Sequence, residues 1–122
     1  MRVEIETWLR GSDDASTEVV ELPISEPAAW TDTDVRVLLE ELLRALERAK
    51  HPDAERNRPI TLRGFSWIVS PFDNAGVILQ LELQLGAAAA GPFAIPQVKL
   101  DELVTRVLKQ AREGQTSEPR VH

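Results

Sequence analysis

The chain has 122 residues, a formal net charge of −6 and no cysteine, with 43% hydrophobic and 28% charged residues. These values are typical of one globular domain held together by packing, and they exclude a disulfide scaffold and thiol catalysis. No apolar run approaches the ~20 residues of a membrane-spanning helix, and the first residues lack the apolar stretch of a signal peptide. We therefore expect a cytoplasmic protein without a membrane partner.

The charges are unevenly distributed along the chain. Residues 1–30 hold two arginines against seven acidic residues, whereas residues 64–98 contain only Asp73 and Glu82 as charged residues. A segment so poor in charge is expected to lie in the middle of a sheet, beneath a partner, or both. The acidic balance also argues against nucleic-acid binding, because Lys and Arg contacts to phosphate supply most of that affinity.

The first 22 residues predict a β-hairpin. Residues 2–10 alternate between apolar and polar side chains, residues 11–16 have turn composition, and 17–22 form a second apolar run. Trp8 falls on the polar phase of its strand, beside Glu4 and Glu6. It is either an anchor for a partner or a cover for the sheet edge or the 24–30 loop.

A helix is predicted from Asp32 to the His51-Pro52 step. Thr31 can cap it together with Asp34 three residues later, and apolar residues recur at helical spacing up to Ala49. The residue before a proline avoids the helical region, so the helix should end there.

A second hairpin is predicted between residues 60 and 85. Its first strand shifts phase at Gly64, where a β-bulge would keep the large side chains on one face, and its second strand alternates from Val77 to Leu85. Helices on one side of the sheet would leave Val20, Ile68 and Ile78 on the other side, which is apolar enough to need a cover.

The stretch Gln84–Pro96, with the sequence QLGAAAAGPFAIP, resembles a phosphate-binding loop only in its glycines. Pro92 and Phe93 stand where such a loop needs an N–H donor, a cation and a hydroxyl. We interpret residues 86–91 as a small-residue exit from the hairpin, where the helix that follows or a second subunit can approach closely. That final helix should run from about Pro96 to Gly114.

The elements together predict an α+β fold. The expected order is ββαββα, with a four-stranded, mainly antiparallel sheet and two helices on one face, in a single domain of residues 1–114 with a flexible polar tail of 115–122. The apolar positions of the two helices match at a constant offset of 65 residues. This offset fits an internal duplication, but any two amphipathic helices can be aligned in this way.

The sequence carries no catalytic motif, and we expect no cofactor and no metal ion, since its acidic pairs do not match the spacing of a cation loop. The leading hypothesis is a non-enzymatic protein-binding domain, adaptor-, chaperone- or immunity-like, that acts through an uncharged sheet surface as a homodimer. The alternative is a small-ligand-binding domain or enzyme with an apolar pocket between sheet and helices, lined by Phe65, Trp67 and Phe93. The candidate partner-binding residues are Trp8, Val20, Ile68, Ile78, Ala88 and Phe93.

Overall fold

The computed structural model describes residues 1–53 and 60–117. It contains the strands β1 (Arg2–Leu9), β2 (Ala15–Glu21), β3 (Ser66–Pro71), β4 (Val77–Glu82) and β5 (Gly86–Phe93), the helices α1 (Asp32–Lys50) and α2 (Gln97–Ser117), and a short 3-10 turn at Pro27–Ala29. The α+β class is confirmed. The predicted four strands and ββαββα order are wrong by one element, because the alanine-rich stretch forms a fifth strand.

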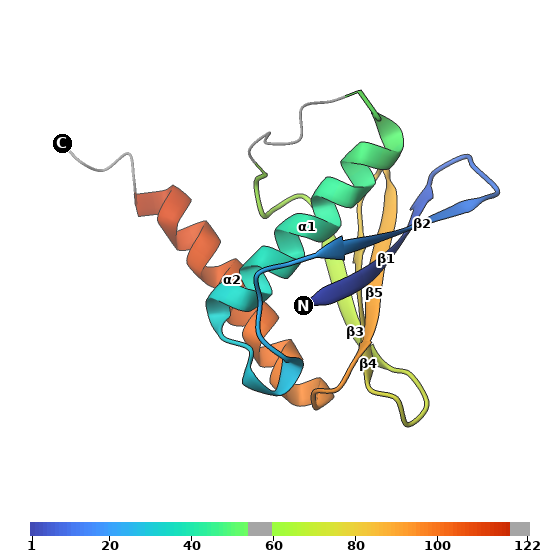
Figure 1. Ribbon diagram of the computed structural model, residues 1–122. Helices are drawn as coiled ribbons and strands as arrows, with labels where there is room; N and C mark the ends of the chain where they lie inside the picture. Colours follow the sequence, from blue (N-terminus) through green and yellow to red (C-terminus); the bar gives the residue numbers. More distant parts are fainter. Residues whose placement is uncertain (54–59, 118–122) are drawn as a thin grey trace.

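The five strands form one antiparallel sheet in the order β2-β1-β5-β4-β3. The segment that includes α1 takes the chain from the edge strand β2 to the opposite edge at β3, and the β3–β4–β5 meander then returns to the middle. The last strand therefore lies between β4 and the first strand, and both helices lie on the same side of the sheet (Figure 1).

Strand β5 forms despite a composition that disfavours it. Alanine and glycine have low β propensity, but the backbone of β5 pairs with β1 on one side and β4 on the other. Ala88 and Ala90 are buried on the helix side, and β5 contacts α1. Side chains this small let a helix lie close to the sheet, and the helix that contacts β5 is α1 rather than the expected following helix α2.

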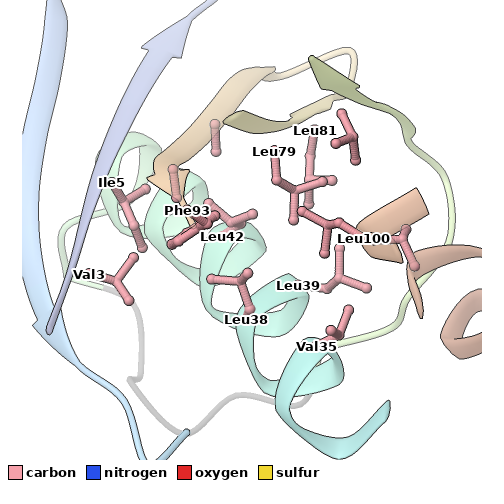
Figure 2. Packing of buried hydrophobic residues seen from close by; sticks show 14 of the residues in the cluster. Val3, Ile5, Val35, Leu38, Leu39, Leu42, Leu79, Leu81, Phe93 and Leu100 are labelled. Atoms are coloured by element: carbon pink, nitrogen blue, oxygen red, sulfur yellow. The ribbon is translucent and has the colours of Figure 1, made fainter. Parts of the chain in front are cut away.

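The core lies between the sheet and the helices. It combines Val3 and Ile5 of β1 and Leu79 and Leu81 of β4 with the apolar stripe of α1, and Leu100 reaches it from α2 (Figure 2). Trp30 and Phe93 close one end with ring centroids 4.9 Å apart in an edge-to-face arrangement. The core thus takes up only one of the two sheet faces.

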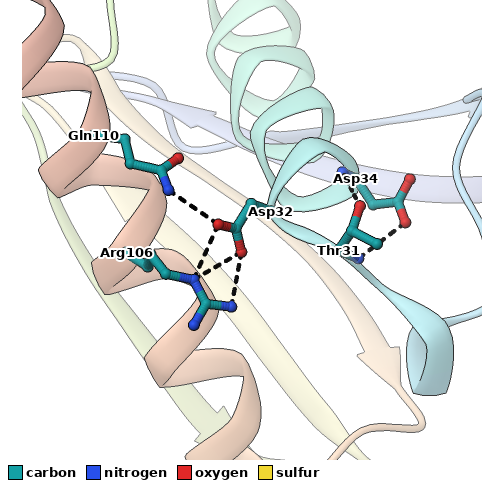
Figure 3. Close-up of polar contacts among 5 residues, drawn as sticks. All are labelled: Thr31, Asp32, Asp34, Arg106 and Gln110. Atoms are coloured by element: carbon teal, nitrogen blue, oxygen red, sulfur yellow. Dashed lines mark hydrogen bonds and ion pairs between the residues drawn. The ribbon is translucent and has the colours of Figure 1, made fainter.

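Helix α1 begins as predicted. The Thr31 hydroxyl accepts a hydrogen bond from the Asp34 backbone N–H at 3.3 Å, and the Asp34 carboxylate accepts one from the Thr31 N–H at 3.1 Å, which completes a capping box (Figure 3). The helix ends at Lys50 with His51 as its C-cap. Helix α2 does not stop at Gly114 but continues to Ser117, and residues 118–122 of the expected tail lie outside the described residues.

A polar contact joins the two helices at the start of α1. The Asp32 carboxylate accepts hydrogen bonds from Arg106 Nε at 2.9 Å and from Gln110 Nε2 at 3.1 Å (Figure 3). The Arg106 bond holds the pKa of Asp32 below its ordinary value, with a further contribution from Gln110. The contact pins the N-terminus of α1 to the middle of α2.

The two helices begin 65 residues apart, at Asp32 and Gln97, in line with the offset seen in the sequence. A repeat of the first ββα unit would account for β3, β4 and α2, but it would leave β5 without a counterpart. The internal duplication stays a prediction.

Candidate functional site: the open sheet face

Strand register decides which side chains lie on the sheet face away from the helices. Residues directly opposite each other in an antiparallel pair share a face, and the pairs Ile5–Ala90 and Leu79–Ala90 belong to the buried face. The alternate residues make up the other face, here called the open face, and neither helix covers it (Figure 1). Its central positions are Glu4, Glu6, Trp8, Thr17, Val19, Ile68, Ile78, Gln80, Glu82, Ala87 and Ala89.

The open face gathers most of the exposed large hydrophobic side chains of the described residues. Trp8 is 37% exposed, Val19 49% and Ile68 57%, and Phe72, just after β3, is 50% exposed. The fifth such residue, Val98, lies on α2. Isolated apolar residues on a surface are ordinary, but their concentration on one uncovered face is typical of an interaction surface.

A furrow runs along β5 in the middle of the open face. Its floor has a small side chain at Ala89 and none at Gly91, while the longer side chains of β1 and β4 stand on either side. A hollow of about 340 Å³ lies here, lined among others by Glu6, Trp8, Ile78, Gln80 and Phe72. Gly91 is required in this place because its φ is +128° and a Cβ would lie 2.7 Å from the Val77 carbonyl oxygen.

The hollow is also acidic. Glu4 and Glu6 of β1 both line it, and neither carboxylate has an ion pair or hydrogen bond among the described residues. The expectation of an uncharged sheet surface is therefore wrong at its centre. The segment 64–98 is poor in charge, as expected, but the neighbouring β1 brings two carboxylates to the same furrow.

On the helix side, by contrast, the carboxylates and arginines pair with each other. Arg48 of α1 donates hydrogen bonds to Glu18 of β2 and, at 2.7 Å, to Glu41. Burial alone would lower the pKa of Arg48, but these hydrogen bonds outweigh it and raise the pKa above its ordinary value. Glu4 and Glu6, unlike these paired residues, make no stabilising ion pair within the described part of the chain.

Three of the six predicted candidates lie on the open face and three do not. Trp8, Ile68 and Ile78 occupy it together. Val20 was expected there, but this is wrong, because Val20 stands opposite Val3 and so faces the helices. The other two are also on the covered side, where Ala88 is 1% exposed and Phe93 is 3% exposed.

Sequence reasoning missed Val19, Phe72 and the two glutamates as members of the site. The run 17–22 is apolar at both Val19 and Val20, so its alternation does not tell which one faces the helices. The residues after Ser70 have the composition of a turn, so strand alternation gives no signal for Phe72. Glu4 and Glu6 carried a signal, since they share the phase of Trp8, but only the position of β5 shows that they line a furrow.

The pocket of the alternative hypothesis does not form as expected. Phe93 is in the core against Trp30, whereas Phe65 and Trp67 are half-buried and line a separate hollow of about 310 Å³ with Leu62 and Leu108, at the side of β3 and α2. The three aromatic residues therefore do not share one cavity.

Other kinds of site find little support in the part of the chain that is described. Residues 1–53 and 60–117 contain no group of three His, Cys, Asp or Glu side chains placed to hold a metal ion. Neither described helix combines the length with the apolar character that crossing a membrane requires. Comparison of the chain with known protein families, curated proteins and solved structures found no match.

Proposed function

We propose that this protein is a non-enzymatic protein-binding domain and that the open face is its docking surface. The observation that carries the proposal is that four of the five exposed large hydrophobic side chains of the described residues belong to the uncovered side of the sheet. An aromatic anchor such as Trp8 at the rim of a hollow is typical of residues that dominate binding energy at protein interfaces.

Site-specific photo-crosslinking in the native cells tests this proposal. A photoreactive amino acid replaces Ile68 on the open face or, as the matched control, Val98 on α2, which is also apolar and exposed. We expect a discrete crosslinked protein from position 68 that is absent from position 98. Equal labelling from both positions, or none from position 68 and none from a second probe at Val19, would refute a docking role for this face.

The low charge of residues 64–98 suggests that the partner is a second copy of the chain, which would make a homodimer. An adduct of twice the chain mass at position 68, together with a concentration-dependent mass in light scattering, would support it. A monomeric mass at all concentrations would refute the homodimer, and the partner would then be a different protein.

Small-ligand binding is the competing proposal, and the hollow beside Phe65 and Trp67 is the observation that favours it. Its volume of about 310 Å³ is at the lower end of the ~300–1,000 Å³ range of small-molecule pockets. A thermal-shift screen with the wild type and Trp67→Ala distinguishes the two functions. A compound that raises the midpoint of the wild type alone would favour a ligand at this hollow over a protein at the open face.

A further inference from the structure

The open face has a sign of charge as well as an apolar character. Glu4, Glu6 and Glu82 lie on it, and at its end Glu21 stands opposite Arg2, the single basic residue among the strand positions of this face. The middle of the face therefore carries carboxylates without a cation. Electrostatic complementarity at interfaces matches such a surface to a positively charged one.

The shape of the furrow also fits a cationic side chain. The floor of the furrow from Ala89 to Gly91 spans about 7 Å, because each strand residue advances the chain by ~3.3 Å. Along one side stand Trp8, Glu6 and Glu4, which are alternate residues of β1. A long cationic side chain can lay its alkyl stem over the alanines while its charged end reaches a glutamate, and an indole beside it adds cation–π attraction.

A second copy of the chain fits this face poorly. In a two-fold dimer the same patch meets itself, so the carboxylates of one copy would approach those of the other. Five strands ~4.8 Å apart and about 20–25 Å long give the face a plan area of roughly 500 Å². Such a face is large enough for a short segment of another protein.

We infer that the partner docks an extended segment in which a lysine or arginine stands beside apolar side chains, with its cation at Glu4 and Glu6 and its apolar neighbours on Trp8, Ile78 and Phe72. This inference rests on the proposed function and specifies the chemistry of the partner. Acidic lipid surfaces and nucleic acids are negatively charged, like the glutamates, and are therefore repelled by this face.

The test is selection of a phage-displayed library of random 12-residue peptides on the immobilised, full-length wild-type protein. The enriched peptides are then synthesised and their affinities measured by fluorescence anisotropy. We expect peptides that combine Lys or Arg with aromatic or aliphatic residues. The variant Glu4→Gln/Glu6→Gln should weaken their binding on the order of tenfold or more, as should raising the salt from roughly 0.05 to 0.5 M.

Two further variants separate the outcomes. Glu102→Gln/Glu113→Gln removes the same number of charges from α2, on the other side of the sheet, and should leave affinity within about twofold. Trp8→Ser removes the apolar anchor. If peptides lose affinity for Trp8→Ser but bind the Glu4→Gln/Glu6→Gln variant as well as the wild type, the inference of a cationic partner is wrong. The proposed function would still hold in that case. An absence of enriched peptides, or binding that ignores all three open-face substitutions, would overturn both.

Discussion

Replacing Ala88 with leucine should destabilise the fold, whereas the same replacement one residue earlier should not. Ala88 is 1% exposed and lies on the helix face between Thr7 and Leu81, on the strand that contacts α1. A leucine adds three carbon atoms at this almost fully buried position, and overpacking in a core costs about 1–3 kcal/mol. Ala87 points to the open face between Trp8 and Glu82, where a leucine changes stability by no more than about 0.5 kcal/mol.

Urea unfolding followed by far-UV circular dichroism measures the difference. With a denaturant slope of about 2 kcal/mol per molar, a cost of ~2 kcal/mol lowers the midpoint of Ala88→Leu by about 1 M at an unchanged slope. The midpoint of Ala87→Leu should stay within about 0.25 M of the wild type. Equal shifts in the two variants, or a larger shift at position 87, would refute both the register of β5 and the claim that only one face of the sheet is covered.

Three further changes test the fold by the same unfolding measurement. In Gly86→Ala, the added Cβ would lie 2.0 Å from a carbonyl oxygen of β1 at a φ of +155°. The loss of stability should clearly exceed that of Gly11→Ala, where φ is +87° but nothing lies within 4 Å and backbone strain alone costs about 1 kcal/mol. Equal losses of stability would contradict the close approach of β5 and β1. Thr31→Ala removes the hydroxyl of the capping box and should cost about 1 kcal/mol, most of which Thr31→Ser should restore. The Arg106 hydrogen bond lowers the pKa of Asp32 from its ordinary value of 3.8, so this contribution is complete above that value and lost as the pH falls through the folded-state pKa. Asp32→Asn should therefore have a lower urea midpoint than the wild type at neutral pH, and the two midpoints should approach each other in acid. A difference between the midpoints that grows in acid would contradict a lowered pKa of Asp32.

The sequence by itself determined the elements whose signals are local. Thr31 and Asp34 satisfy backbone N–H groups at the start of α1, and His51-Pro52 ends the helix, all within a few residues of the chain. The alternation of β1 and β4 fixed which of their side chains share a face, and so placed Trp8 and Ile78 correctly on the uncovered side.

Tertiary structure decided what depends on neighbours distant in the sequence. The alanines of β5 have little intrinsic tendency to form a strand, and they do so because β1 and β4 supply hydrogen-bonding partners on both sides while α1 needs small side chains beneath it. Which of Val19 and Val20 faces outward followed from the pairing of β2 with β1.

The candidate site shows the same division. Its single residues could be found from the phase of each strand, but the furrow exists only because the last strand lies beside the first. That pairing places Glu6 of β1 and Gln80 of β4 on either side of Ala89, although the three residues come from three different parts of the chain. Strand order is set by the global packing of the sheet under its helices, and alternation within one strand carries no information about it.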